Sequence, residues 1–267
     1  FIPAFGVKGI GIATIISQLV SFLVILFKVL KNERVRKITS EYLVPKFLFF
    51  KNIFFQSMPI SVSICGYALA AAIIFTYVGQ SGEYAVAGYG VGTRIEQVVL
   101  LPILGINTAI ISIIAQNYGA NNLVRIKETY FTAIKYAFII MITAGTLVFL
   151  SASVITSFFS SDPEVIEYGK RYLKISAFVL PAYPVFFLSN GFFMALKKSE
   201  NAMISNFFRN VLNPIAVFYI AKYINASFET FFWIWVGINW FFSISYFLIV
   251  IYYFKTRLEK FSAVVHP

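Results

Sequence analysis

The chain has 267 residues, of which 59% are hydrophobic and only 12% charged, and its formal net charge is +11. A soluble domain has roughly half apolar and about a quarter charged residues. The composition therefore excludes an ordinary soluble enzyme, a disordered chain and a soluble nucleic-acid-binding domain. A single cysteine, Cys65, and a single histidine, His266, exclude an internal disulfide and a Cys or His metal cluster. Because the first residue is Phe1 rather than Met, we expect a processed or incomplete chain.

Long apolar runs predict an all-α integral membrane protein with seven transmembrane helices. A helix needs about 20 apolar residues to cross a bilayer, whereas strands of a membrane barrel would be shorter and would alternate. Pro59 is expected to start the second helix. In chain order, the predicted spans are 9–27, 58–79, 96–117, 136–161, 175–196, 201–221 and 230–254.

The distribution of basic residues predicts how these spans are oriented. If the first span runs from outside to inside, most of the 22 Lys and Arg residues lie in loops on the inner side. Short inner loops carry such an excess in membrane proteins. We therefore expect a multi-pass protein of the plasma membrane with a cytoplasmic C-terminus. Its positive charge would face anionic lipid of the bilayer rather than nucleic acid.

Residues 31–56 form the longest polar connection. The first part is strongly basic, and the second part, 42–55, mixes aromatic and basic residues. This second part is typical of an amphipathic helix at the inner interface. The alternative is that it extends the next span.

Charged residues within spans are functional candidates, because a charge inside a bilayer is costly. Arg94 and Glu96 lie at the outer end of the predicted third span, and Arg209 lies within the sixth. Glu96 and Asn107 are close to three helical turns apart and are expected to share a face. An ordinary interfacial pairing of Glu96 with Arg94 is the alternative for that carboxylate.

Asparagines add a polar stripe to the sixth span. Asn206, Asn210 and Asn213 follow the spacing i, i+4 and i+7. They would face either a polar cavity or other helices, as interhelical hydrogen bonds. Aromatic side chains in such a cavity would attract organic cations, although an arginine there would also permit an anionic or zwitterionic substrate. The candidate substrate or ion site comprises Glu96, Asn107, Asn190, Arg209, Asn213, Tyr67 and Tyr183, with no metal site.

Four prolines lie inside predicted spans and predict broken or kinked helices: Pro102, Pro181, Pro184 and Pro214. Broken helices near the membrane centre are typical of transporters.

Glycines follow each other at alternate positions before the third span. Gly88, Gly90 and Gly92 do not form a dinucleotide loop, because no βαβ pattern surrounds them. The spacing of Gly88 and Gly92 fits close helix packing. We find no plausible catalytic set, so we do not expect an enzyme.

Several segments together resemble one transporter family. The run RIEQVVLLPILGINTAIISIIAQNYGANNLVRIKE at 94–128 resembles the eighth span of the multidrug and toxin extrusion (MATE) family and the basic loop that follows it. DPEVIEYGKRYL at 162–173 is similar to the loop before the family's tenth span. Met58-Pro59 is similar to the start of the seventh span, and GVKGIGIATIISQ at 6–18 to the sixth.

The resemblance implies two lobes of six helices each. Residues 1–30 would then be the last helix of an otherwise missing N-terminal lobe, 31–56 the cytoplasmic connection, and 57–267 the complete C-terminal lobe. The family exports organic cations and other amphipathic compounds in exchange for Na⁺ or H⁺ by alternating access, which implies a small organic substrate and no cofactor other than the coupling ion.

This sequence departs from the family pattern at the coupling acid. Some branches carry that acid in the seventh or tenth span, but 60–79 and 175–196 contain neither Asp nor Glu. Glu96 is then the candidate within this chain. The alternatives are a flippase for lipid-linked saccharides, which shares the fold, and a seven-span receptor, which shares the topology.

Overall fold

The computed structural model describes residues 6–31 and 47–258, and within these ranges every regular element is a helix. The helical fold class is thus confirmed. The chain divides into two compact units, Phe1–Phe55 and Gln56–Pro267.

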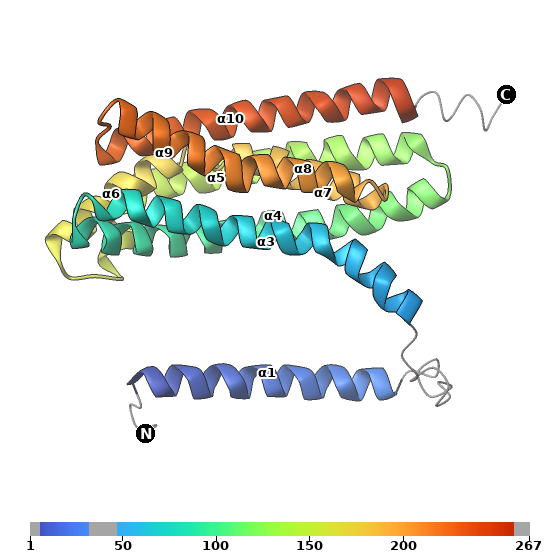
Figure 1. Cartoon of the computed structure of the whole chain (residues 1–267), viewed down its shortest axis with the longest axis horizontal. Coiled ribbons are helices and arrows are strands. Elements are labelled where there is room, and N and C mark those ends of the chain that lie inside the picture. Colours follow the sequence, from blue (N-terminus) through green and yellow to red (C-terminus); the bar gives the residue numbers. More distant parts are fainter. Residues whose placement is uncertain (1–5, 32–46, 259–267) are drawn as a thin grey trace. The chain divides into compact units, whose positions relative to one another are not determined.

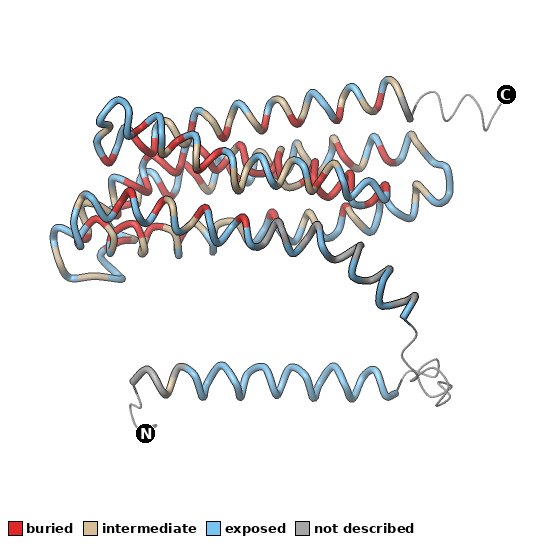
Figure 2. The backbone as a smooth tube through the Cα atoms, viewed as in Figure 1, coloured by how far each residue is buried: buried red, intermediate tan, exposed pale blue. Residues whose placement is uncertain are grey.

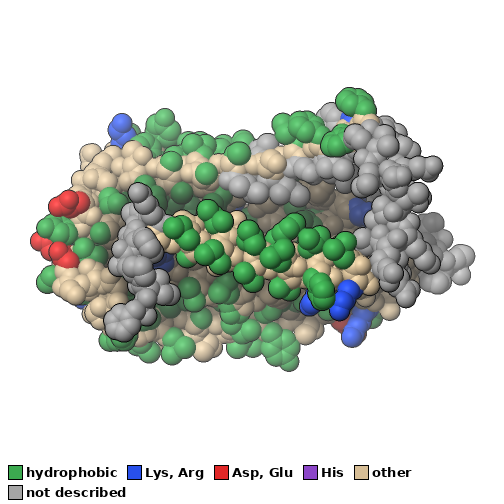
Figure 3. All heavy atoms as spheres, turned by 90° about the horizontal axis from the view of Figure 1, so that it is seen from below, with side chains coloured by type: hydrophobic (Ala, Val, Ile, Leu, Met, Phe, Trp, Pro, Cys, Tyr) green, Lys and Arg blue, Asp and Glu red, His purple; other side chains and the backbone are tan. Residues whose placement is uncertain are grey.

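The first unit contains α1 (Gly6–Leu30), a helix of 25 residues. At 1.5 Å per residue it is about 38 Å long, enough to cross a bilayer. Residues 11–30 are exposed throughout, as Figure 2 shows by colour, and they include most of the helix's large apolar side chains. Figure 3 shows hydrophobic side chains along the face of this helix that it presents. A helix that is apolar all round belongs in lipid or against other helices. The first predicted span is confirmed as a helix.

Helix α3 (Phe47–Gly79) is longer than predicted and corrects two expectations. It is continuous from Phe47, so residues 47–55 extend the next helix rather than form a separate interfacial one. Residues 42–46 lie outside the described residues. Pro59 lies inside α3 and does not start it. A proline removes one intrahelical bond, whereas a new helix end would release several backbone groups at membrane depth.

The second unit is a helical bundle centred on α4 (Glu83–Gly119). Helix α4 packs against α5 (Leu123–Ser157), α6 (Pro163–Ser176) and α7 (Ala182–Ala195), as Figure 1 shows. The side chain of Asn122 caps α5 by accepting from the backbone N–H of Arg125 at 3.1 Å. The carboxylate of Asp162 caps α6 by accepting from Glu164 and Val165.

The C-terminal part of the bundle is made of shorter pieces and one long helix. Helix α8 (Ser199–Phe207) continues through a π-helical turn, η2 (Phe208–Leu212), into α9 (Asn213–Tyr223). Helix α10 (Phe228–Tyr253) begins at a Ser227 cap and packs against α6, α7 and α9, before a second π-helical turn, η3 (Phe254–Leu258).

Four helices among the described residues are long and apolar enough to cross a membrane, and they cover 11–30, 83–119, 123–157 and 228–256. Two shorter apolar helical segments cover 65–79 and 182–195. The predicted fifth span is divided between α6 and α7, and the sixth between α8, η2 and α9. The count of seven spans therefore stays a prediction.

The prolines differ in their effect on the helices. Pro181 ends a short non-helical stretch, 177–181, between α6 and α7, and Pro184 follows in the first turn of α7. Pro214 lies in the first turn of α9, directly after η2. The break predicted at Pro102 is wrong, because α4 runs through it without interruption. Pro102 is exposed, so a single lost backbone bond there leaves the packed face of α4 intact.

Glycines let α4 approach α6 closely. A Cβ added at Gly88 would lie 2.7 Å from the backbone N of Gly169, so only glycine fits at this crossing. A Cβ at Gly92 would lie 2.2 Å from Cδ1 of Tyr172. The predicted role of the Gly88–Gly92 pair in close helix packing is confirmed.

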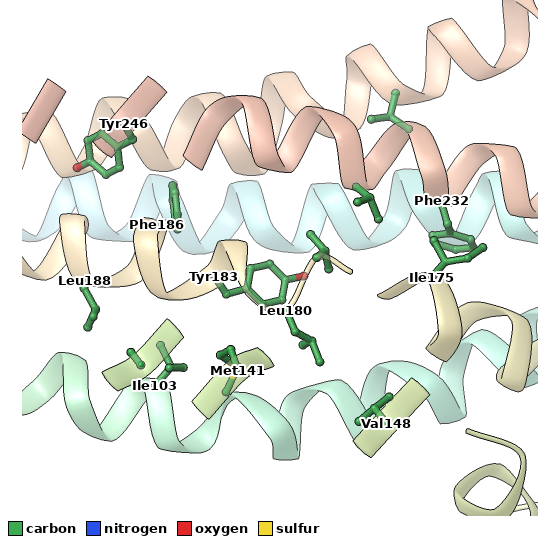
Figure 4. Close-up of a cluster of buried hydrophobic side chains, with 14 of the residues drawn as sticks. Ile103, Met141, Val148, Ile175, Leu180, Tyr183, Phe186, Leu188, Phe232 and Tyr246 are labelled. Carbon is green, nitrogen blue, oxygen red and sulfur yellow. The ribbon is translucent and has the colours of Figure 1, made fainter. Parts of the chain in front are cut away.

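The core of the second unit joins all the long helices. Figure 4 shows buried side chains from α4, α5, α6, α7 and α10 converging in one cluster. Tyr183 and Phe186 enter it from α7, and Phe232 and Tyr246 enter it from α10. Tyr183 and Phe232 belong both to this cluster and to the lining of a cavity beside it.

Candidate functional site

A cavity of about 460 Å³ lies in the second unit between α3, α4, α6, α7, η2 and α10. Its volume is in the range of small-molecule sites. The polar side chains that line it, apart from tyrosines, are Thr93, Glu96, Gln97, Arg209 and Asn210. The aromatic ones are Tyr67, Tyr89, Tyr172, Tyr183, Phe187, Phe232 and Trp235.

Glu96 lies deep along α4 rather than at a helix end. Since α4 begins at Glu83, Glu96 is about 20 Å along its axis. The expectation that Glu96 sits at the outer end of its helix is therefore wrong. The run 83–95, which contains charges and glycines, extends the helix because the glycines pack against α6.

Two tyrosine hydroxyls hold the Glu96 carboxylate. Tyr183 donates to Oε1 at 2.5 Å, and Tyr172 donates to Oε2. No ion pair joins Glu96 to Arg94 in the described part of the chain, and Arg94 is exposed. Residues two apart on a helix do not face each other, so the interfacial pairing with Arg94 does not form.

Tyr172 was not anticipated from the sequence. Its ring lies beside Gly92 and packs edge to face with Tyr89 and Phe232, at centroid distances of 4.9 and 4.8 Å. Gly92 and Glu96 are one turn apart on α4, so the missing side chain at 92 leaves room for a ring whose hydroxyl reaches 96. The spacing Gly-x-x-x-Glu at 92–96 is the sequence feature that could have indicated an aromatic ring packed beside Glu96.

Arg209 projects from η2 onto a set of aromatic rings. Its guanidinium carbon lies 4.3 Å from the ring centre of Phe186, 4.9 Å from Tyr183 and 5.3 Å from Phe187. Its Nε donates to Oδ1 of Asn239 at 3.4 Å. The ion pairs found among the described residues do not include Arg209.

Asn239 is a second residue that the sequence did not single out. It is 2% exposed, and its amide nitrogen donates to the carbonyl of Trp235 at 2.9 Å. This bond within α10 fixes the amide so that its oxygen faces Arg209. A single asparagine in an otherwise apolar helix carries no pattern that distinguishes this role from ordinary packing.

The structure brings Glu96, Tyr67, Tyr183 and Arg209 together around the cavity but not the three predicted asparagines. Asn190 accepts from Tyr246 at 3.0 Å and donates to Asn206 at 3.2 Å, which joins α7, α8 and α10. Asn190 thus forms hydrogen bonds between helices, which was the alternative to lining a polar cavity.

Asn107 and Asn213 also lie away from the cavity lining. Asn107 packs against Gly191 of α7 rather than facing the cavity with Glu96. Its buried amide oxygen, like both amide atoms of the fully buried Asn213, has no hydrogen-bond partner among the described residues. The expected stripe of Asn206, Asn210 and Asn213 is interrupted by η2, which shifts the helical register, and only Asn210 lines the cavity.

Charged residues outside the spans link α6 to α10. Glu167 accepts from Lys170 at 2.9 Å and from Arg171 at 3.0 Å, and Arg171 also pairs with Glu229 at 3.4 Å. The hydrogen bonds from Lys170 and then Arg171 lower the pKa of the Glu167 carboxyl below its usual value. No group of three or more metal-ligating His, Cys, Asp or Glu side chains occurs in the ranges that the structure describes.

Comparisons with known proteins agree with this architecture. The MatE family model matches residues 59–219, which is more than half of the chain. "Probable multidrug resistance protein YpnP" of Bacillus subtilis (strain 168) is 27% identical over 239 residues, covering 89% of this chain and 51% of that protein. This chain thus spans about half the length of the curated relatives it matches.

Solved structures show the same fold. An outward-facing multidrug resistance MATE transporter of the MOP superfamily superposes with a TM-score of 0.81 at 24% identity, over 96% of this chain and 58% of that one. An inward-facing structure superposes with a TM-score of 0.77 at 23% identity, over 96% and 59%. On the strength of the family match across more than half of its length, the chain belongs to the MatE family.

Proposed function

We propose that this chain is the C-terminal part of a secondary antiporter that exports drugs or other amphipathic organic compounds in exchange for Na⁺ or H⁺. The observation that carries the proposal is the cavity in which an acid, Glu96, and a base, Arg209, lie among aromatic rings. Family membership supports a transporter over a seven-span receptor. The printed names of curated relatives, such as a multidrug resistance protein, support export of drugs.

The working protein would contain an N-terminal lobe that this chain lacks. The half-length match to relatives supports this arrangement. Residues 1–30 would supply the last helix of that lobe, 31–56 the cytoplasmic connection and 57–267 a six-helix lobe. This part would have seven spans and would lie in the plasma membrane. The excess of Lys and Arg in its inner loops supports a cytoplasmic C-terminus.

Alternating access would move the cavity between the two sides of the membrane. Related structures exist in outward-facing and inward-facing forms, which supports such a cycle. Two helix interruptions lie beside the cavity. The break at 177–181 comes just before Tyr183, and the π turn η2 contains Arg209; both side chains line the cavity. Helices broken beside the binding site are the elements expected to move.

Glu96 would couple the ion to this movement. As a carboxylate it accepts one hydroxyl on each oxygen, from Tyr172 on α6 and Tyr183 on α7. A bound proton turns one of these oxygens into a donor, so the hydroxyl that donates to it must accept instead or find another acceptor. A bound Na⁺ would instead draw the carboxylate and hydroxyl oxygens toward itself. Either ion would change how α6 and α7 meet across the break at 177–181.

The test is gradient-driven flux in proteoliposomes. The protein expressed from the complete reading frame that contains this sequence is reconstituted in vesicles preloaded with Na⁺ or at acidic internal pH. Uptake of two amphipathic aromatic compounds of opposite charge, ethidium and 2-naphthoate, is then followed separately. We expect accumulation that collapses when an ionophore dissipates the coupling gradient. Uptake that is equal with and without either gradient would contradict the antiport mechanism.

A further inference from the structure

Arg209 forms no ion pair among the described residues, and the one carboxylate that acts on it, Glu96 of the same cavity, does so without direct contact. Arg209 lies half-buried at the cavity, its guanidinium faces three aromatic rings, and one amide oxygen, that of Asn239, accepts from its Nε. Charges removed from water are normally paired or bound to a ligand, because desolvation without a partner is costly. Aromatic faces offset only part of this cost.

Glu96 is close by but is already engaged. Both of its oxygens accept tyrosine hydroxyls, and no ion pair between Glu96 and Arg209 occurs in the described ranges. The acid of the cavity thus accepts from a neutral donor on each oxygen, whereas Arg209 has a long hydrogen bond of 3.4 Å to Asn239 and one to the Tyr183 hydroxyl, which itself donates to Glu96. Arg209 is therefore the less fully engaged of the two charges, and most of its donors remain open to a ligand.

The surroundings of Arg209 suit an anionic group attached to an aromatic body. Asn210 and Gln97 line the same cavity and add amide donors. Phe187, Phe232 and Trp235 supply apolar wall. The planar guanidinium matches a carboxylate, sulfonate or phosphate with two parallel hydrogen bonds, which a lysine does not reproduce.

We propose that the cavity binds amphipathic aromatic anions, with the ligand's acidic group on the Arg209 guanidinium and its ring against the aromatic wall. This inference rests on the proposed function, because it names the substrate class of the same cavity. It predicts a preference opposite to that of an exporter of organic cations.

The experiment compares two ligands that share a ring system and differ in charge. Binding of 2-naphthoate and of N,N,N-trimethyl-2-naphthylammonium to the purified protein in lipid nanodiscs is measured by titration calorimetry. Empty nanodiscs serve as the blank. We expect 2-naphthoate to bind at least about tenfold more tightly than the ammonium, the ratio that one charge-assisted hydrogen bond supplies.

Variants locate this preference. Arg209→Gln is expected to lower the affinity for 2-naphthoate about tenfold or more and to leave the ammonium unchanged or bound more tightly. Arg209→Lys keeps the positive charge but loses the planar guanidinium that forms two parallel hydrogen bonds, so it should retain part of the affinity. Arg94→Gln, which removes an exposed arginine of α4 outside the cavity, should change neither ligand.

Two results would overturn the inference. One is tighter binding of the ammonium by the unmodified protein, which needs no variant to fold. The other is an unchanged affinity for 2-naphthoate in both Arg209 variants. Binding is measured without an ion gradient, so anion binding at Arg209 without gradient-driven flux would refute the antiporter and keep this inference. Gradient-driven flux of cations without binding of 2-naphthoate would support the antiporter and refute this inference.

Discussion

Glu96 and Arg209, the two charged side chains of the cavity, are stabilised in different ways. Glu96 accepts hydroxyl hydrogen bonds from two helices, and Arg209 rests on aromatic rings with one amide contact. Both residues could be selected from the sequence, because a charge within an apolar run is costly enough to imply a role. Their partners Tyr172 and Asn239 could not, since their roles depend on how α6 and α10 meet the cavity.

The asparagines show where residue-level reasoning failed. Helical spacing placed Asn107 on the face of Glu96 and Asn213 in line with Asn210, yet neither lines the cavity. For Asn213 the cause is η2, because a π turn shifts every later residue around the helix axis. A π turn leaves no simple pattern in sequence, so the register after it could not be predicted.

Gly92→Ala tests the link between Gly92, Tyr172 and Glu96. The added Cβ would lie 2.2 Å from the Tyr172 ring, so the ring must move and lose its bond to Glu96. We expect a loss of about 1–3 kcal/mol in unfolding free energy, together with reduced gradient-driven flux. Thermal unfolding in detergent and proteoliposome flux measure the two effects.

Gly90→Ala is the matched control for that substitution. A Cβ at Gly90, on the same helix, has no atom within 4 Å. Alanine is favoured over glycine in a helix by about 1 kcal/mol, so Gly90→Ala should be neutral or slightly stabilising. Equal behaviour of the two variants would contradict the packing role assigned to Gly92.

At the scale of elements, the helices were predictable and their interruptions only partly so. Long apolar runs fixed the existence of α1, α4, α5 and α10, because length and hydrophobicity alone determine a spanning helix. Proline correctly suggested the interruption before α7 but misled at Pro102 and Pro59. Whether a proline ends a helix depends on what the freed backbone groups contact, which the local sequence does not contain.

The break between α6 and α7 is stabilised from α10. The indole Nε1 of Trp240 donates to the carbonyl of Phe178 at 2.8 Å, within the non-helical stretch. We expect Trp240→Phe to leave that carbonyl without its donor and to speed amide hydrogen exchange across 177–180, with little change in α4 or α5. Trp233→Phe, which alters a neighbouring ring that also packs on Phe178, is the control and should exchange as the unmodified protein does. Equal acceleration in both variants would refute the hydrogen bond's role.

The ion pairs of α6 predict a pH dependence. Because the bonds from Lys170 and Arg171 lower the pKa of Glu167 in the folded protein, their stabilisation is present above the unfolded pKa of about 4.3 and is lost as the pH falls through the folded value. Glu167→Gln should therefore cost less than about 1 kcal/mol at pH 7, since exposed pairs are screened by solvent. The difference from the unmodified protein in thermal unfolding should shrink as the pH falls below about 4.3, the unfolded pKa of a glutamate. A difference that grows on acidification would contradict this assignment.

At the scale of the whole molecule, a few motifs were enough to predict the MATE family, and the family match over residues 59–219 confirms that prediction. The cavity itself was predictable only in part, because it is assembled from six elements spread between Tyr67 and Trp235. Sequence spacing relates residues on one helix, whereas the meeting of Glu96 with Tyr172 and Tyr183 depends on how three helices pack.

The most direct test of the account is gradient-driven flux through the protein with Glu96→Gln, compared with Glu83→Gln. Both changes remove one carboxylate from α4, but Glu83 lies exposed in the first turn and Glu96 lines the cavity. We predict that Glu96→Gln abolishes ion-driven accumulation while the protein still folds and binds substrate, and that Glu83→Gln transports normally. Undiminished ion-driven accumulation by Glu96→Gln would contradict the claim that this cavity couples ion to substrate.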